Sequence, residues 1–188
     1  MFDRFDDPMP RARAEDGFTV VGLPGLAFFT VCALGVLWWG ATGEHWVPLL
    51  DSANLAFHEA GHPFFFALSE PLGVYGGTLF QLFFPVATTA HFVRRGETVS
   101  TAFCALWLAQ NLLNISRYMA DARAMELPLV GGLNPEEHHD WRLILTRWGL
   151  LETDTRLAGL LEVVAVLAVF GLLGGLFWRW HRDRAPDA

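Results

Sequence analysis

The sequence predicts an all-α integral membrane protein, a bundle of about five apolar helices. The first observation is composition, because 53% of the 188 residues are hydrophobic and the mean hydropathy is positive. The second is patterning: the apolar residues gather in blocks close to the roughly 20 residues that a helix needs to cross a bilayer. A helix satisfies its own backbone hydrogen bonds, which lipid cannot do. The third is that most acidic residues fall in tails and loops.

Five blocks have the length of membrane spans. The segment before them, 1–17, is a polar tail of mixed charge, unlike the basic start of a secretory signal, so we expect the first block to be a retained anchor. The loop 121–156 is too polar to span and is expected to carry an interfacial helix from Pro135 to Leu150. A short C-terminal tail occupies 181–188. The predicted spans cover about 18–39, 46–68, 74–93, 99–120 and 157–180.

Two arrangements of the second block, 46–68, stay open. With five full spans, Arg94 and Arg95 lie across the membrane from the N-terminal arginines, against the tendency of basic loops to face the cytoplasm. If the block is re-entrant, both tails and Arg94 and Arg95 are inside and the long loop is outside. We favour five spans. In both arrangements the second and fourth blocks run in the same direction, and we expect a bacterial inner membrane with lipid around the bundle.

Composition and motifs exclude several classes of protein. The net charge is -7 and no basic stripe with interleaved aromatic residues exists, so we expect no nucleic-acid partner. Cys32 and Cys104 each lie inside an apolar block, where a cysteine is most often a small buried hydrophobe, and no disulfide framework is implied. The sequence has no GxSxG elbow, P-loop or dinucleotide glycine fingerprint, which leaves serine-nucleophile, nucleotide and nicotinamide chemistry without support.

The second block carries the pattern His-Glu-Ala-Gly-His, which predicts a metal site. Ionisable side chains are costly inside a membrane helix, so they indicate function there by default. His58 and His62 stand one helical turn apart on the same face, which lets both imidazoles reach one zinc ion. Glu59, beside the first ligand, is placed to act as general base toward zinc-bound water. Gly61 would let another helix or a substrate come close.

A catalytic zinc site usually takes three protein ligands, so a third must be found. The fourth block carries polar residues at helical spacing, which form a stripe that we expect to face protein or water. Asp121, at the end of this stripe, is our first candidate for the third ligand. Alternatively, Asp121 pairs with Arg117 or Arg123. The competing source is the long loop, where we single out His139, while His139 and Asp140 could instead cover the site. The stripe comprises Gln110, Asn114, Arg117 and Asp121, and the loop run comprises Glu136, Glu137, His138, His139 and Asp140.

Other polar residues in the apolar blocks have more modest interpretations. Glu162, early in the fifth block, is predicted to be a partner that orients a zinc-binding histidine. Gln81 and His91 in the third block are each interpreted as helix-packing hydrogen bonds rather than ligands.

The His58–His62 motif in an apolar helix, followed by one span and then a helix with Asn114 and Asp121, resembles the site-2 protease family of intramembrane zinc metalloproteases. The resemblance covers roughly residues 46–122. It implies that His58, His62 and Asp121 bind zinc and that Glu59 activates water to cut a substrate helix within the bilayer. The chain is close to the minimal core of that family, without a PDZ-like insert.

The function that the sequence predicts is therefore an intramembrane zinc endopeptidase, a hydrolase acting on a membrane-embedded peptide or protein. The alternative is a noncatalytic subunit of a larger membrane protein complex, with a structural or degenerate metal site. Glu59 discriminates between the two, because a peptidase needs the carboxylate and a structural zinc site tolerates glutamine there. A membrane di-iron oxygenase would need more histidines, in repeated boxes, than the chain offers.

Overall fold

The chain is all-helical wherever its secondary structure is described. A computed structural model describes residues 12–42, 47, 49–132 and 134–184; most of the predicted N-terminal tail and residues 185–188 of the C-terminal tail lie outside these residues. Apart from one isolated bridge between Arg13 and Thr19, the described residues contain no β-structure. The longer helices are α1 (Leu23–Ala41), α2 (Leu50–Phe66), α3 (Glu70–Arg94), α4 (Thr98–Ala120), α6 (Asp140–Trp148) and α7 (Asp154–Arg182). The short ones are η1 (Val130–Gly132), α5 (Pro135–His138) and η2 (Leu151–Thr153).

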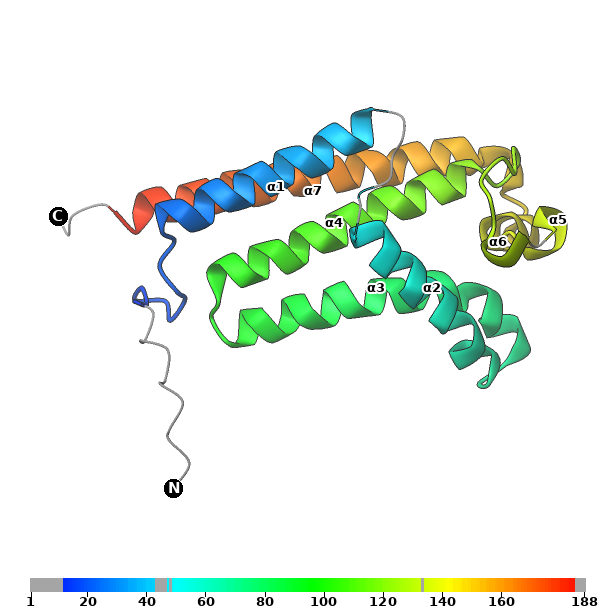
Figure 1. Ribbon diagram of the computed structural model, residues 1–188, viewed down its shortest axis with the longest axis horizontal. Helices are drawn as coiled ribbons and strands as arrows, with labels where there is room; N and C mark the ends of the chain where they lie inside the picture. Colours follow the sequence, from blue (N-terminus) through cyan, green and yellow to red (C-terminus); the bar gives the residue numbers. More distant parts are fainter. Residues whose placement is uncertain (1–11, 43–46, 48, 133, 185–188) are drawn as a thin grey trace, which may run out of the picture.

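Four helices, α1, α3, α4 and α7, run along the long axis of the molecule (Figure 1). Helices α1, α4 and α7 share an apolar core, in which Phe29, Leu106 and Val169 are almost fully buried. Two helical segments of the described chain are long and apolar enough to cross a membrane: Leu23–Gly40, and Leu151–Arg182, which joins η2 to α7.

The two described ends of the chain meet at one end of the bundle. The guanidinium of Arg179 donates to the Asp16 carboxylate at 2.7 and 2.8 Å, and the backbone amide of Val21 donates to Asp183 at 3.2 Å. The turn between α3 and α4 joins them, because the Thr19 amide donates to the carbonyl of Gly96 at 2.7 Å. The two described ends of the chain therefore lie at the end of the bundle where α3 passes into α4 (Figure 1).

Helix α2, with 17 residues, is shorter than the four helices along the long axis. Its first turn lies against the middle of α4, where Asp51 accepts hydrogen bonds from Gln110 at 2.6 Å and Asn114 at 2.9 Å. From there α2 runs toward the end of the bundle that carries α5 and α6 (Figure 1). This path is compatible with the re-entrant alternative, and the choice between that alternative and the five full spans that we favoured stays a prediction. Helices α2 and α4 run in the same direction, as predicted.

Helices α2 and α3 approach through glycines. A Cβ atom added to Gly61 would overlap the backbone carbonyl of Gly76, and one added to Gly76 would lie 2.6 Å from the Gly61 oxygen. Only glycine leaves room for two backbones at this separation. The close approach expected at Gly61 is thus made by α3, which brings the N-terminal half of that helix against the histidine pair.

Candidate metal centre

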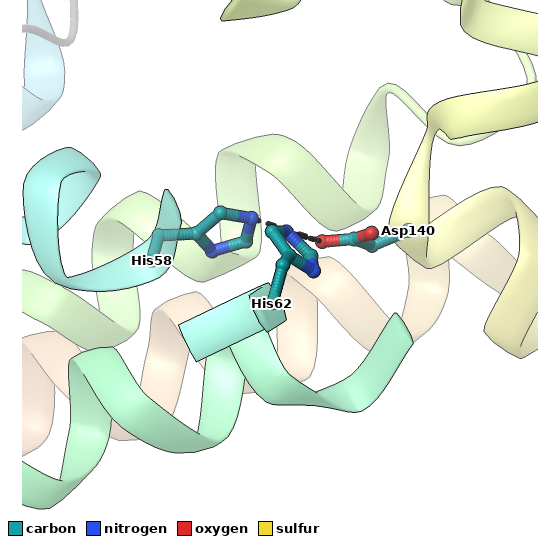
Figure 2. Close-up of side chains that lie close together, drawn as sticks. All are labelled: His58, His62 and Asp140. Atoms are coloured by element: carbon teal, nitrogen blue, oxygen red, sulfur yellow. Dashed lines mark ion pairs between the residues drawn. The ribbon is translucent and has the colours of Figure 1, made fainter. Parts of the chain in front are cut away.

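Three side chains from distant parts of the chain converge at the end of the bundle where α2 ends (Figure 2). His58 and His62 lie on one face of α2, as their spacing predicts. The Nε2 atoms of His58 and His62 are 2.9 and 3.3 Å from one atom, Oδ2 of Asp140. His58 and Asp140 are buried and His62 is partly exposed. Among the residues that the structure describes, this is the one cluster of histidine, cysteine and carboxylate side chains close enough to share a metal ion.

Asp140 reaches the histidines because the predicted interfacial helix is broken. The expected single helix is two pieces, α5 and α6, separated by His139 with an extended ψ of 103°. Asp140 is the first residue of α6, and its backbone amide donates to the hydroxyl oxygen of Tyr118 at 3.2 Å. The apolar face of α6 buries Ile144 and Leu145 in the core that α6 shares with α4. The break and the packing together aim the Asp140 carboxylate at α2.

A backbone carbonyl sets the orientation of the His62 ring. Nδ1 of His62 lies 2.9 Å from the carbonyl oxygen of Gly73. Because a carbonyl oxygen only accepts, Nδ1 must carry the hydrogen and donate it. In a neutral ring Nε2 then presents a lone pair, and it presents it toward Asp140.

A chain of amides fixes the His58 ring in the same way. The backbone carbonyl of Gln81 accepts from Nδ2 of Asn111 at 2.8 Å, which leaves Oδ1 of Asn111 to accept from Nε2 of Gln81, also at 2.8 Å. Oε1 of Gln81 therefore faces Nδ1 of His58, 2.8 Å away. Nδ1 must donate, so Nε2 of His58 also presents a lone pair to Asp140.

The result is three electron-pair donors facing one another with no hydrogen between them when both rings are neutral. The donor atoms of His58, His62 and Asp140 all lie within 4.8 Å of one another. Oδ2 of Asp140 is buried and receives no hydrogen bond. Such an arrangement calls for a positive charge, from a bound cation or from protonation of one of the rings, because a buried carboxylate without a partner is strongly disfavoured. The three residues can hold a metal ion, and Gln81 and the Gly73 carbonyl hold the two rings in place behind it.

The two residues predicted to supply the third ligand do not join the histidine pair. The Asp121 carboxylate instead accepts from the backbone amides of Glu126 at 2.9 Å and Leu127 at 3.1 Å. Its Oδ2 also lies 3.3 Å from Nε2 of His139. Nδ1 of His139 accepts from the amide of Arg142 at 3.3 Å, so Nε2 carries the hydrogen that faces Asp121. Burial lowers the pKa of the His139 imidazole, although the Asp121 carboxylate opposes this.

In the described part of the chain, Asp121 forms no ion pair with either alternative partner considered for it, Arg117 or Arg123. Arg123 pairs with Asp154 at 2.8 Å and with Glu152 at 3.3 Å. Glu162, predicted to orient a zinc-binding histidine, lines a separate cavity between α1, α4 and α7, and Gln81 is the side chain that holds His58 instead. Our interpretation of Gln81 as a helix-packing hydrogen bond was correct but incomplete.

Of the polar stripe of α4, predicted to face protein or water, Gln110 and Asn114 contact α2, and Gln110 extends the network behind His58. Asn54 links the two helices, since it donates to Gln110 at 2.8 Å and accepts from Asn111 at 3.1 Å. Asn111 lies beside the stripe and was missed. Its position directly after Gln110 could have indicated a second polar contact, on the side of α4 that faces α3, where Gln81 is also buried. A continuous set of buried hydrogen bonds thus runs from Asp51 to His58.

Glu59, the predicted general base, is exposed and lines a cavity of about 430 Å³ together with all three candidate ligands. The cavity also has apolar walls from α3, α6 and the segment before α5. A substrate bound in this cavity would contact both the candidate metal ligands and the Glu59 carboxylate.

Comparison with known proteins gives no family for this chain, because no family model, no curated protein and no solved structure matches it.

Proposed function

We propose that this protein is an intramembrane zinc endopeptidase, in which His58, His62 and Asp140 bind the metal and Glu59 is the general base. The observation that carries the proposal is the convergence of three electron-pair donors beside Glu59 in one cavity. Two imidazole nitrogens and one carboxylate oxygen form a donor set typical of catalytic zinc, which uses three protein ligands and leaves one position open. The proposal keeps the predicted histidine pair and general base and replaces Asp121 and His139 with Asp140.

The distribution of polar and apolar side chains supports a membrane location. Large apolar residues of α1 and α7 are more than half exposed, among them Phe28 at 63%, Trp38 at 70% and Leu167 at 64%. The most buried positions instead include Asn54 and Asn111, both fully buried. Lipid favours an apolar exterior and allows polar groups where helices pack and hydrogen-bond with one another. An apolar exterior of this extent in water would be an aggregation liability.

The residues suit peptide hydrolysis. When bound, a zinc ion would activate a peptide carbonyl and a water molecule as a Lewis acid. Glu59 accepts one proton of the water as its oxygen bonds to the carbonyl carbon. Glu59 then passes this proton to the leaving nitrogen as the carbon–nitrogen bond breaks. The products are a carboxylic acid and an amine, and the Glu59 carboxylate is regenerated.

The test combines metal content with cleavage. Zinc per chain is measured by plasma mass spectrometry on detergent-purified wild type, His58→Ala, Asp140→Asn and Glu59→Gln, and cleavage of a quenched fluorescent apolar peptide is followed in parallel. We expect one zinc ion in wild type and in Glu59→Gln, but cleavage only in wild type. His58→Ala and Asp140→Asn should lose both properties.

Two results would overturn the proposal. Absence of zinc from a wild-type preparation made without chelators would remove the metal centre. Zinc without any cleavage that depends on Glu59, across a set of apolar peptides, would favour the alternative of a noncatalytic subunit with a structural metal site in a membrane complex.

A further inference from the structure

A second cavity lies beside Glu59, on the side away from Asp140. It measures about 210 Å³ and shares five lining residues with the larger cavity: His58, Glu59, Tyr118, Leu129 and Val130. The two cavities therefore meet along the candidate general base. An extended peptide whose scissile bond lies at Glu59 would place its two halves in different cavities.

The two cavities differ in charge. The larger one contains Glu137 and Asp140 and is lined by no lysine or arginine. The smaller one is lined by one cationic side chain, Arg117 of α4, within walls that are mainly apolar and include Leu55, Leu127 and Pro128. A peptide that occupied both cavities would therefore meet different charges in its two halves.

Arg117 makes no hydrogen bond or ion pair with any other residue that the structure describes. The nearby carboxylates do not bond to it. Asp51 acts on Arg117 only through its charge, because its carboxylate oxygens accept hydrogen bonds from Gln110, Asn114 and the amide of Val47. Glu162 lines the neighbouring cavity, which Arg117 also borders, and Glu59 lines the smaller cavity beside it. Neither of these two carboxylates forms an ion pair with Arg117. Among the described residues, none uses the five donors of this guanidinium, which lines a largely apolar cavity.

We propose that Arg117 is a specificity residue that binds a carboxylate of the substrate, on the side of the scissile bond opposite Asp140. The chemistry is the two-pronged pairing of a planar guanidinium with a carboxylate, which is strongest where water is excluded. The carboxylate is either the C-terminus of the peptide or an acidic side chain close to the cleaved bond. The inference rests on the proposed peptidase function for its biological meaning, but the binding site can be tested without catalysis.

The test measures peptide binding by fluorescence polarisation to the full-length Glu59→Gln protein in detergent, which is expected not to cleave. Four labelled apolar peptides of one length and sequence are compared: one with a free C-terminus, one with a C-terminal amide, and two amidated peptides with an internal glutamate or an internal glutamine. Each is measured again with Arg117→Met, with Arg117→Lys, and with Arg156→Met as the matched control. Arg156 is exposed on α7 and lines none of the cavities beside Glu59.

We expect at least one carboxylate peptide to bind about tenfold or more tightly than its neutral counterpart, as a charge-assisted hydrogen bond allows. Arg117→Met should abolish this preference, Arg117→Lys should retain part of it, and Arg156→Met should leave it intact. Preference for the free C-terminus identifies the terminal carboxylate, and preference for internal glutamate identifies an acidic side chain.

Equal binding of all four peptides, failure of all four to bind, or a preference that survives Arg117→Met would overturn the proposal. The carboxylate-binding proposal can be distinguished from the peptidase proposal in the same experiments. Binding that depends on Arg117 in a wild-type protein that cleaves none of the peptides would contradict the catalytic proposal and support the carboxylate site.

Discussion

Nε2 of His139 lies 3.3 Å from Oδ2 of Asp121, so the two residues predicted to compete for the metal contact each other instead. Both are buried, and Asp121 also accepts two backbone amides of the segment that follows α4. This contact ties the end of α4 to His139, the residue that directly precedes Asp140. We infer that it positions Asp140 without binding the metal.

This predicts different outcomes for two aspartates. Asp140→Asn should remove bound zinc, because an amide oxygen is a much weaker ligand than a carboxylate. Asp121→Asn should keep one zinc ion per chain and lower the stability by about 1–3 kcal/mol, since a buried hydrogen-bonded charge is lost. Zinc content and thermal unfolding in detergent check both. Loss of zinc in Asp121→Asn with retention in Asp140→Asn would restore the original ligand assignment.

The amide behind His58 gives a second prediction. Gln81→Leu removes the acceptor for Nδ1 of His58, and we expect zinc affinity to fall by about 10–100-fold, the usual effect of losing a group that orients a ligand. Gln110→Leu is the matched control, because Gln110 belongs to the same buried network but bonds to Asp51 and Asn54 and not to His58. It should destabilise the protein and leave zinc affinity unchanged. Competition with a chromogenic chelator measures both affinities, and equal losses would contradict a specific role for Gln81.

Gly77 offers a steric test of the same ring. A Cβ atom at this position would lie 2.5 Å from Cε1 and 2.6 Å from Nε2 of His58, so Gly77→Ala should push the imidazole out of line and weaken zinc binding. Gly35→Ala in α1 is the control, because nothing lies within 4 Å of its added Cβ atom. In a helix interior that change should stabilise by about 0.5–1 kcal/mol. A Gly77→Ala protein with wild-type zinc affinity would show that the ring is not held against α3.

The sequence was sufficient for the features that depend on local spacing. His58 and His62 meet on one face because helical geometry places residues i and i+4 together. The third ligand depends on tertiary structure. Asp140 reaches α2 only because the chain breaks at His139 and α6 packs on α4. Asp121 lies at the end of α4, but its carboxylate accepts hydrogen bonds from the amides of Glu126 and Leu127, in a turn that hydrophobic periodicity does not predict.

The position at which α2 begins relative to α4 could not be predicted from the sequence either. Block length alone predicted a full span at 46–68, and composition could not show that Asp51 would be satisfied halfway along α4. Hydrogen bonds from Gln110 and Asn114 let the helix begin there. A buried polar network can thus satisfy an acidic side chain in the first turn of a helix within an apolar bundle.

The contact between Asp16 and α7 predicts a pH dependence. Hydrogen bonds from Arg179, then from Arg182, hold the pKa of the Asp16 carboxyl well below its usual range. A lowered folded-state pKa gives a stabilisation that is present above the unfolded pKa, about 3.9, and is lost as pH falls through the folded value. Asp16→Asn should therefore lower the melting temperature at pH 7, and the difference from wild type should narrow below about pH 4. Glu15→Gln, at an exposed neighbour, should show no such difference. A difference in melting temperature between Asp16→Asn and wild type that stays constant with pH would show that the Asp16 charge does not cause it.

If the bundle lies in a membrane with its long axis across it, and α2 does not count as a separate crossing because it begins beside the middle of α4, the number of crossings is even. Positions near the two ends of the chain then share one face of the membrane. We replace Cys32 and Cys104 with serine and introduce Glu15→Cys, Arg184→Cys or Glu136→Cys, one at a time, at exposed positions. A membrane-impermeant maleimide applied to intact cells should label Glu15→Cys and Arg184→Cys alike and Glu136→Cys oppositely, while permeabilised cells should label all three. Five full spans would instead separate the two terminal positions, since an odd number of crossings puts the ends of the chain on opposite faces. Labelling of Glu15→Cys without Arg184→Cys, or the reverse, would therefore reject the re-entrant path.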